Sequence, residues 1–436
     1  MSERTVLPAA GPLRGRVSVP GDKSIAHRAV MFNAAGQGEA LVRGLPSGRD
    51  VASTMAAMAG LGAGIERLGL DSVRVRGRDL VFDRSPGRID CENSGTTMRL
   101  LCGLLAGQQG LDATLVGDAS LSRRPMRRVA EPLARLGALI ETTEGHAPVR
   151  IRGGLLTGAE VALAVASAQV KSAVILAGLQ GQGTTAVVEP ASSRDHTERL
   201  LRAMGVDLIV GGADGHGAGG CRVEVSGPAA LACVDVLVPG DPSSAAFLLV
   251  AAAIVPGSEV TIDGVLLNPT RLGFLHVLRR MGADIQCSVD ALVGGEEVGT
   301  ITARFSRLRA FEVAADEVPA TIDELPLLAV AAAFADGMSV VRGAAELRVK
   351  ESDRIAATAA LLGAMGIRVD VFDDGFCVHG GVPRGGASVL THGDHRIAMS
   401  AAVAALACVE GVTVDDAESV AVSFPEFFDV LARLGA

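Results

Sequence analysis

The chain has 436 residues, enough for two or three domains if each takes about 150 residues. Hydrophobic residues make up 49% of the sequence and charged residues 20%, a balance that excludes a disordered chain. The net charge is −9, and the sequence has neither a basic block nor Trp or Tyr, so we expect no nucleic-acid partner.

The cysteines and the apolar segments indicate where in the cell the protein is found. The seven cysteines are scattered and show no CxxC spacing, which is typical of a protein kept in a reducing cytosol. The N-terminal stretch lacks the apolar segment of a secretory signal. The longest apolar run, 327–335, is far shorter than the roughly 20 residues of a membrane span. We therefore expect a cytoplasmic protein that has no membrane partner.

A repeated pattern runs through the chain from its first hundred residues to its end. A Leu-Gly or Met-Gly pair closes a helix-forming stretch at 61–62, 136–137, 204–205, 281–282, 365–366 and 434–435. A polar loop opens an Ala- and Leu-rich helix at 21–28, 92–99, 166–172, 240–247, 322–328 and 393–400. The glycine suits the left-handed residue that follows many helices. The repeats predict an α/β architecture of six copies of one unit, in which strands and helices alternate.

The fragment VPGD divides the repeats into two sets. It occurs at 19–22 and at 238–241, each time after a short apolar strand and before a helix. Three repeats lie between the two copies and three follow the second. We infer two lobes of three repeats each: residues 22–238, and residues 1–21 with 239–436. The two VPGD segments would then cross between the lobes as a hinge; the alternative is a recurring turn without a mechanical role.

Familiar cofactor motifs are missing or misplaced. GHGAGG at 215–220 fits G-x-G-x-x-G, but strand-like runs flank it and no helix follows, so we interpret it as a hairpin tip. The sequence contains neither a Walker phosphate loop nor H-E-x-x-H, and its Cys and His residues do not cluster. We therefore expect no metal.

Basic side chains gather at the loops that open the helices. The residues are Lys23 with the hydroxyl of Ser24, then Arg28, Arg124, Lys350, Arg354 and Arg396. Helix N-termini, Lys and Arg all favour phosphate and carboxylate groups. In an acidic protein this arrangement predicts a site for an anion that carries several negative charges. The alternative is that each residue is a solvated charge or a helix cap.

Carboxylates stand among these cations. Asp323 and Glu324 precede one apolar helix, and Glu351 lies within a K-E-x-x-R group. Such a carboxylate can neutralise its neighbours, and in a site closed to water it can also move protons. For Asp323 the alternative is a helix N-cap.

Nine short motifs occur in order: PGDKS (20–24), NSGTTMR (93–99), SRRP (122–125), SAQVK (167–171), RDHTE (194–198), NPTR (268–271), RVKESDR (348–354), GDHRIAM (393–399) and SFPEF (423–427). Each is weak alone, but nine in order are specific. On these motifs the chain resembles the 5-enolpyruvylshikimate-3-phosphate synthase family over essentially its whole length. The resemblance implies a two-lobed inside-out α/β barrel fold with six βαβαββ repeats, three per lobe, that close on the substrates.

The resemblance also implies a reaction. The enolpyruvyl group of phosphoenolpyruvate is transferred to the 5-hydroxyl of shikimate 3-phosphate, a step in the biosynthesis of chorismate and aromatic amino acids. Addition gives a tetrahedral ketal phosphate, and elimination then releases phosphate. No metal or organic cofactor is needed, and the partners are the two small-molecule substrates. We expect a monomer because one chain supplies the whole site.

Site residues follow from the matched motifs. The resemblance implies that shikimate 3-phosphate is bound by Lys23, Ser24, Arg28, Ser167, the backbone of Ala168, Gln169, Arg194, Asp323 and Lys350. It implies that phosphoenolpyruvate is bound by Lys23, Gly95, Arg124, Gln169, Arg354 and Arg396. The catalytic residues would be Glu351, as proton carrier at the methylene carbon, Asp323, as acceptor of the 5-hydroxyl proton, and Lys23, which touches the reacting atoms.

A subgroup is indicated as well. GDKS, SAQVK, RDHTE and NPTR resemble the bacterial class that tolerates glyphosate, an inhibitor that occupies the phosphoenolpyruvate site. Leu100 stands where sensitive members have Pro, and Val422 stands where they have Lys. Gly95, however, stands where a tolerant member has Ala, whose methyl crowds the inhibitor. We therefore hypothesise that inhibition is reduced but not absent.

Two alternatives remain. The related UDP-N-acetylglucosamine enolpyruvyl transferases share the fold and the donor, but they usually have a Lys-Asn pair near the start and a reactive Cys on a loop. Here the pair is Lys23-Ser24, and the corresponding loop, GDASLSRRP (117–125), has no Cys. A non-catalytic anion-binding protein of the same fold would bind substrates without releasing phosphate. Binding alone would not require Glu351 beside the cations.

Overall fold

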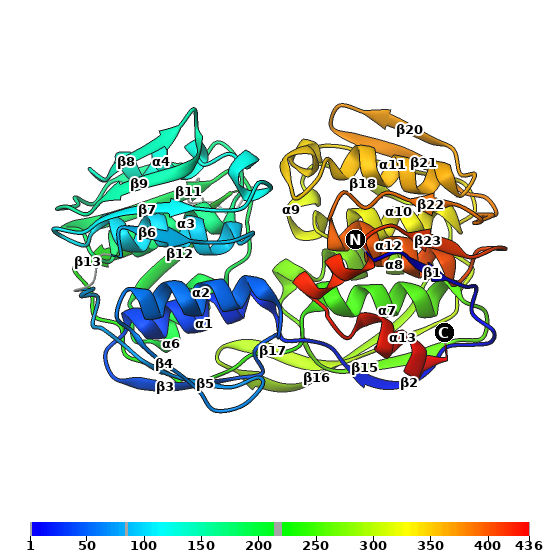
Figure 1. Cartoon of the computed structure of the whole chain (residues 1–436), viewed down its shortest axis with the longest axis horizontal. Helices are drawn as coiled ribbons and strands as arrows, with labels where there is room; N and C mark the ends of the chain where they lie inside the picture. Colours follow the sequence, from blue (N-terminus) through cyan, green and yellow to red (C-terminus); the bar gives the residue numbers. More distant parts are fainter. Residues whose placement is uncertain (1, 83–85, 213–219, 436) are drawn as a thin grey trace. The chain divides into compact units, whose positions relative to one another are not determined.

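The computed structural model describes residues 2–82, 86–212 and 220–435 (Figure 1). Contacts within the chain divide it into two compact units. The middle unit comprises Asp22–Val238 with the short segment Val293–Gly295. The terminal unit comprises Met1–Gly21, Pro239–Leu292 and Glu296–Ala436. The chain therefore changes units inside each VPGD fragment.

One sheet plan recurs in the described residues of both units. A short outer strand runs parallel to a second strand, and a hairpin adds two antiparallel strands beside it. Parallel neighbours cannot be joined by a tight turn, so a helix lies between the first two strands. Another helix leads from the second strand into the hairpin, and the repeat reads βαβαββ.

The middle unit contains three such sheets, with the strand orders β14-β3-β5-β4, β6-β7-β9-β8 and β10-β11-β13-β12. The strands are β3 (Glu39–Arg43), β4 (Gly64–Arg67), β5 (Val73–Arg76), β6 (Arg88–Asp90), β7 (Asp112–Val116), β8 (Leu139–Thr143), β9 (His146–Arg152), β10 (Glu160–Ala162), β11 (Gly183–Glu189), β12 (Leu208–Gly212), β13 (Cys221–Gly227) and β14 (Val236–Leu237). The helices are α1 (Lys23–Ala35), α2 (Arg49–Gly60), α3 (Gly95–Ala106), η1 (Leu121–Arg123), α4 (Arg127–Ala134), α5 (Ala168–Gly178) and α6 (His196–Ala203).

The terminal unit has the orders β16-β17-β15-β2, β18-β19-β21-β20 and β1-β23-β22. The strands are β1 (Arg4–Val6), β2 (Arg14–Ser18), β15 (Glu259–Leu266), β16 (Asp284–Val293), β17 (Glu296–Arg304), β18 (Glu312–Val313), β19 (Met338–Val341), β20 (Val369–Phe372), β21 (Gly375–His379), β22 (Ser388–Val389) and β23 (Val412–Val414). The helices are α7 (Pro242–Ile254), η2 (Pro269–Arg271), α8 (Gly273–Arg280), α9 (Val318–Thr321), α10 (Leu325–Ala333), η3 (Ala345–Val349), α11 (Arg354–Ala364), α12 (His395–Ala405), η4 (Ala417–Val422) and α13 (Phe427–Leu434). Its third sheet is completed from the N-terminus, because β1 pairs antiparallel with β23.

Each change of unit follows directly after an outer strand. β2 pairs parallel with β15 before the first VPGD fragment, and β14 pairs parallel with β3 before the second. Within the terminal unit, Gly21 and Gly240 form an antiparallel bridge, and the amide of Asp241 donates to the carbonyl of Pro20 at 2.8 Å. The two VPGD fragments thus pair with each other through the backbone.

The structure confirms the six-copy α/β reading of the sequence. The glycines of all six Leu-Gly or Met-Gly pairs follow a helix and have φ between +83° and +101°, the left-handed conformation expected there. β12 and β13, which flank GHGAGG, are antiparallel neighbours. Most of that fragment lies outside the described residues, so the hairpin tip stays a prediction.

The cores are aliphatic, as a sequence without Trp or Tyr requires. In the terminal unit α7, α10 and α12 pack against one another, and nearly every residue of these helices is buried. In the middle unit α3 packs against α5 at close range. A Cβ atom added to Gly103 of α3 would lie 2.0 Å from the carbonyl oxygen of Ala173 in α5. Small residues therefore set the separation of these central helices.

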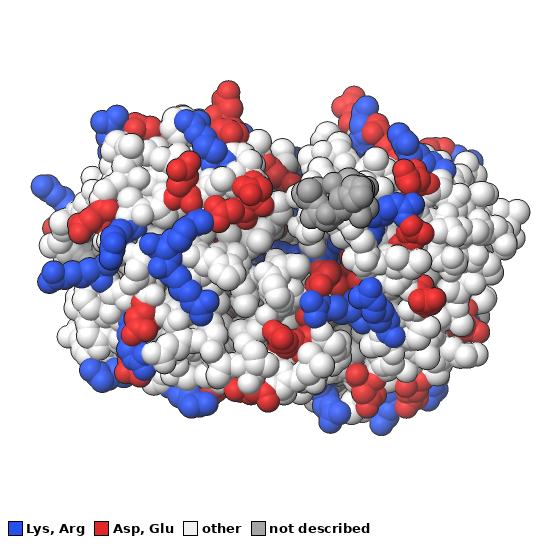
Figure 2. All heavy atoms as spheres, turned by 180° about the vertical axis from the view of Figure 1, so that it is seen from behind, with Lys and Arg blue, Asp and Glu red and all other residues white. Residues whose placement is uncertain are grey.

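The surface has mixed charge. On the face drawn in Figure 2, Lys and Arg side chains are interspersed with Asp and Glu. Among the described residues, none of the helices combines the length and the apolar character needed to cross a bilayer.

We predict that Gly103→Ala pushes α3 away from α5 and lowers stability by about 1–3 kcal/mol, the usual cost of overpacking. The midpoint of urea unfolding, followed by far-UV circular dichroism, measures this loss. The matched control is Gly60→Ala at the end of α2, where an added Cβ meets no atom within 4 Å. Equal midpoints for the two variants would contradict the close packing of α3 and α5.

Candidate active site

Three helices of the middle unit begin at capped polar loops. A side chain accepts a hydrogen bond from an amide in the first turn in each case: Asp22 from Ile25 at 2.8 Å, Ser94 from Thr97 at 3.2 Å, and Ser167 from Val170 at 3.5 Å. The caps fix where α1, α3 and α5 start. The first residues of these helices are therefore the candidates Lys23, Gly95 and Ala168, at the positive end of each helix dipole.

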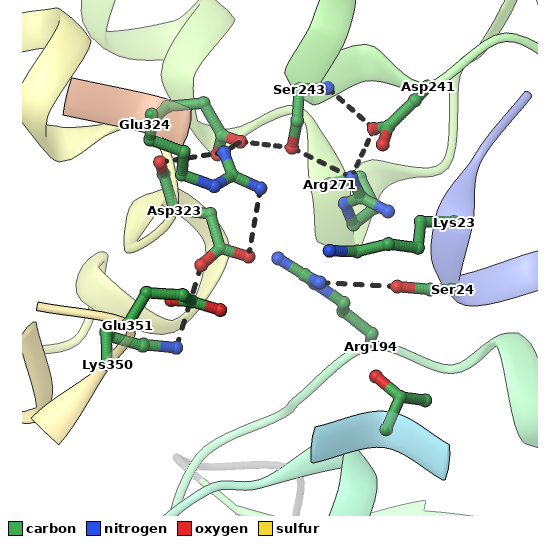
Figure 3. A network of polar contacts seen from close by, with 12 residues as sticks. Lys23, Ser24, Arg194, Asp241, Ser243, Arg271, Asp323, Glu324, Lys350 and Glu351 are labelled. Atoms are coloured by element: carbon green, nitrogen blue, oxygen red, sulfur yellow. Dashed lines mark hydrogen bonds and ion pairs between the residues drawn. The ribbon is translucent and has the colours of Figure 1, made fainter. Parts of the chain in front are cut away.

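Lys23 is held by an acidic residue that sequence reasoning missed. Its Nζ lies 2.9 Å from Oδ2 of Asp50 in the first turn of α2, and its side chain is 24% exposed. The hydroxyl of Ser24, the next residue, accepts from Nη1 of Arg194 at 3.5 Å (Figure 3). The structure thus brings Lys23, Ser24 and Arg194 into one cluster.

Arg28 lies deeper than its neighbours and is 2% exposed. Its Nε donates to the hydroxyl of Thr197 at 2.7 Å, Nη1 to the carbonyl of Ser24 at 3.0 Å, and Nη2 to the hydroxyl of Ser172 at 2.8 Å. All three nitrogens of the guanidinium therefore bond to protein. Arg28 links the start of α1 to α5 and α6, and its direct contact with a substrate stays a prediction.

Gly95 lies beneath two guanidinium groups. A Cβ atom added there would be 2.9 Å from Nη1 of Arg99 and 3.3 Å from Nη1 of Arg124. Arg99 donates to Oε1 of Gln169 at 2.6 Å, and Arg124 donates to Oδ1 of Asn93 at 2.7 Å. The candidates Gly95, Arg124 and Gln169 thus form a second cluster, and Arg99 and Asn93 orient two of them.

In the terminal unit, Asp323 is surrounded by cations. Its carboxylate oxygens lie 3.6 Å from Nζ of Lys350, 3.5 Å from Nη1 of Arg354 and 3.8 Å from Nη2 of Arg396 (Figure 3 shows the contact with Lys350). Three positively charged side chains therefore lie within 4 Å of this one carboxylate. The N-cap position of α10 is Glu324, not Asp323, so the N-cap reading of Asp323 was wrong.

Arg354 is fully buried between acidic groups. Its Nε lies 2.8 Å from Oδ2 of Asp394, and its Nη2 donates to Oε2 of Glu351 at 2.7 Å. Burial works against its charge, but Asp394 and Glu351 outweigh that effect and raise the pKa of Arg354. Burial likewise opposes the charge of Asp394, and Arg354 outweighs it and lowers the pKa of that carboxyl. The pair therefore stays fully ionised at neutral pH.

Arg396 is oriented by a chain of buried polar groups that sequence reasoning did not connect. Its Nη1 donates to the carbonyl of Asp323 at 2.9 Å and to Oε1 of Glu324 at 3.3 Å. The hydroxyl of Ser243 donates to the same oxygen of Glu324, and Arg271 in turn donates to Ser243 at 3.1 Å (Figure 3). The NPTR motif, which contains Arg271, therefore supports a candidate site residue from a distance.

Five of the candidate cations, in the two clusters of the middle unit and around Asp323 in the terminal unit, are not solvated charges. Arg124 and Arg354 are buried, and the side chains of Lys23 and Lys350 are less than a quarter exposed. Arg354, Arg396 and Lys23 all contact carboxylates within their own unit. The alternative reading as exposed charges is wrong for these residues.

One cluster outside these sets has side chains of the metal-ligand type. Asp370, Cys377 and His379 on the β20–β21 hairpin each have a ligand atom within 4.8 Å of the others. Arg368, however, donates to Asp370 at 3.1 Å, and His379 bonds to the same residue at 2.7 Å. The guanidinium already satisfies the charge that would attract a cation.

Comparison with known proteins decides the family. A family model described as EPSP synthase (3-phosphoshikimate 1-carboxyvinyltransferase) matches residues 8–431. The chain belongs to the EPSP synthase family. A relative from Synechococcus sp. (strain JA-3-3Ab) with that enzyme name is 50% identical over 433 residues, covering 99% of this chain and 96% of the relative. A relative of the same name from Caulobacter vibrioides (strain NA1000 / CB15N) is 49% identical, covering 98% and 96%.

Solved structures agree with the family. The EPSP synthase of Acinetobacter baumannii is 41% identical with a TM-score of 0.87, covering 100% of this chain and 98% of that one. The enolpyruvyl transferase NikO of Streptomyces tendae, at 20% identity and a TM-score of 0.77, shows the shared fold alone; it covers 100% and 98%. The resemblance found in the motifs is confirmed, and the chain has the two-domain inside-out α/β fold of EPSP synthases.

We predict that Asp394→Asn lowers the unfolding free energy at pH 7 by about 3–5 kcal/mol, because it leaves the buried Arg354 with an incomplete set of carboxylates. The control is Asp370→Asn in the same unit, whose exposed ion pair with Arg368 should leave the urea midpoint unchanged.

The contribution of Asp394 to the unfolding free energy should depend on pH. The pKa of Asp394 is lowered by folding, so its contribution is complete above the ordinary Asp pKa of about 3.9 and is lost as the pH falls through the folded value. The difference in urea midpoint between the native chain and Asp394→Asn should therefore shrink below about pH 3.9. A difference that stays constant between pH 7 and pH 3 would contradict the buried ion pair.

Proposed function

We propose that the chain transfers the enolpyruvyl group of phosphoenolpyruvate to the 5-hydroxyl of shikimate 3-phosphate, with release of phosphate, in the shikimate pathway. The observation that carries the proposal is the set of cations at the starts of the helices, each held by a carboxylate or an amide of the protein. The relatives that bear the enzyme's name match over nearly the whole chain and support it.

The charges suit the two substrates. Both are anions and repel each other, so the site must supply fixed positive groups. Each charge-assisted hydrogen bond contributes about 1.5–3 kcal/mol. We assign shikimate 3-phosphate to Lys23, Ser24, Arg28, Ser167, Ala168, Gln169, Arg194, Asp323 and Lys350. We assign phosphoenolpyruvate to Lys23, Gly95, Arg124, Gln169, Arg354 and Arg396.

The carboxylates supply the proton transfers. Asp323, whose carboxylate lies within 4 Å of Lys350, Arg354 and Arg396, accepts the proton of the 5-hydroxyl as that oxygen bonds to C2 of phosphoenolpyruvate. Glu351, in its protonated form, gives a proton to the methylene carbon C3, which completes the tetrahedral ketal phosphate. In the elimination the Glu351 carboxylate takes a proton from C3, the C2=C3 double bond forms again, the bond from C2 to the phosphate oxygen breaks, and phosphate departs. Lys23 offsets negative charge on the reacting oxygens.

The same reaction bears on the partners, the oligomeric state and the location of the protein. The substrates are small molecules, and the residue set comes from one chain, so we propose a monomer that uses no metal and no organic cofactor. All seven cysteines are free thiols, which supports a cytoplasmic location.

Phosphate release from phosphoenolpyruvate tests the proposed function. Purified protein is offered shikimate 3-phosphate and UDP-N-acetylglucosamine separately, with a chelator present. Release with shikimate 3-phosphate alone is the expected result. Release only with the nucleotide sugar would overturn the acceptor, and binding of shikimate 3-phosphate without release would favour the non-catalytic alternative.

We predict that Glu351→Gln lowers kcat by about 100-fold or more, the usual contribution of a general acid or base, and leaves the KM for shikimate 3-phosphate within a few-fold. The initial rate of phosphate release at saturating substrates measures it. Glu312→Gln, an exposed carboxylate on β18 in the same unit, is the control. Full turnover by Glu351→Gln would remove Glu351 from the mechanism.

Glyphosate inhibition tests the subgroup. We propose that glyphosate inhibits this chain more weakly than it inhibits sensitive members of the family. A methyl at Gly95 would press on Arg99 and Arg124, so Gly95→Ala should raise the inhibition constant further and raise the KM for phosphoenolpyruvate. Initial rates of phosphate release, taken over a range of phosphoenolpyruvate and glyphosate concentrations, give both the KM and the inhibition constant. An inhibition constant for the native chain equal to that of a sensitive enzyme would contradict the proposal.

A further inference from the structure

The proposed chemistry makes no use of a buried group of three charged residues in the middle unit. Nζ of Lys171 lies 2.9 Å from Oε2 of Glu189 and 2.8 Å from Oε1 of Glu198. Their side chains are 1%, 0% and 2% exposed. Apolar residues of similar volume often stabilise a fold as well as such a buried ionic group does, so stability alone gives little reason for it.

The three residues lie next to the residues assigned to shikimate 3-phosphate. Lys171 is on α5, four residues after the cap Ser167, and its backbone amide donates to the carbonyl of Ser167 at 2.9 Å. Glu198 is in the first turn of α6, four residues after Arg194. Glu189 ends β11, between the two helices in sequence. The ionic group therefore connects the elements that carry Ser167 and Arg194.

The carboxylate of Glu189 makes the link direct. Its Oε1 accepts the backbone amide of Ser167 at 2.9 Å, and its Oε2 accepts the hydroxyl of Ser193 at 2.8 Å. Ser193 precedes Arg194 in the chain. One buried carboxylate thus holds both the start of α5 and the loop that presents Arg194, and Lys171 holds that carboxylate.

A hydrogen bond between two uncharged side chains also connects α5 with α6, next to the ion pair. The hydroxyls of Ser172 and Thr197, the residues beside Lys171 and Glu198, lie 2.6 Å apart. Both accept from Arg28. The starts of α1, α5 and α6 are therefore held to one another within the middle unit, by polar groups that do not reach solvent.

The charge of the group argues against a direct role in binding. Burial alone lowers the pKa of Lys171, but Glu198 and Glu189 outweigh it and raise the pKa, so the ammonium persists at neutral pH. One ammonium between two carboxylates has no surplus positive charge to attract a phosphate.

We propose that Lys171 and Glu198 are positioning residues for the phosphorylated acceptor: their buried ion pair fixes Ser167, Ala168 and Arg194 in the geometry that binds shikimate 3-phosphate. The proposal rests on the function proposed above. It predicts a specific kinetic signature. The KM for the acceptor rises when the pair is broken, while kcat at saturating acceptor and the KM for phosphoenolpyruvate change little.

Glu198→Gln tests this with the least disturbance, because it keeps the shape of the side chain and leaves Lys171 paired with Glu189. We expect the KM for shikimate 3-phosphate, and its Kd by isothermal titration calorimetry, to rise about tenfold. The KM for phosphoenolpyruvate should stay within about threefold. The double variant Lys171→Gln with Glu198→Gln keeps the net charge of the group; it should show the same split, and it decides the matter if the single variant does not fold.

Leu201→Ala is the matched control. Leu201 is a fully buried apolar residue of α6, so its loss destabilises the same helix and leaves the ion pair in place. Glu198→Gln with an unchanged acceptor KM would overturn the proposal. The proposal would also be overturned if Glu198→Gln and Leu201→Ala, compared at equal urea midpoints, changed kcat and both KM values by the same factors. Failure of the native chain to release phosphate with shikimate 3-phosphate would instead overturn the proposed function.

Discussion

Clustered cations repel one another, and acidic partners placed behind them allow a folded chain to hold them near a binding site. The rest of the candidate site depends on this constraint. Lys23 is held by Asp50, and Arg354 is held by Asp394. In the first pair the side chain of Asp50 is less exposed than that of Lys23, and in the second pair both side chains are fully buried. The basic groups are thereby fixed before a substrate arrives, which lowers the entropic cost of binding.

The repeated fold supplies the places for these pairs. Each repeat begins a central helix at a polar loop, and a side chain caps that helix in α1, α3, α5, α7 and α12. Small residues let the central helices pack closely, as at Gly103. The starts of α1, α3, α5 and α12 carry the candidates Lys23, Gly95, Ala168 and Arg396, and the acidic partners of Lys23 and Arg396 come from other elements of the same unit. Pre-organisation of this kind suits a transferase whose two substrates are both anions.

The repeats, the helix starts and the cations could be read from the sequence because each is a local pattern. A glycine after a helix and a capping Asp or Ser act over a few residues. The partners of the cations could not be read. Asp50 is 27 residues from Lys23, and Glu324 is 72 residues from Arg396, so no spacing rule connects them. Arg28 is a different case: the resemblance implies a binding residue, the fold holds it with Ser172 and Thr197, and its contact with a substrate stays a prediction.

The most direct test of this account changes an acidic partner and leaves the cation in place. Glu324→Gln removes the charge behind Arg396 without touching a group assigned to either substrate. We predict that the KM for phosphoenolpyruvate rises about tenfold while the KM for shikimate 3-phosphate is unchanged, with the exposed Glu418→Gln as control. An unchanged KM for phosphoenolpyruvate in a folded Glu324→Gln protein would contradict the claim that buried carboxylates hold the substrate-binding cations in place.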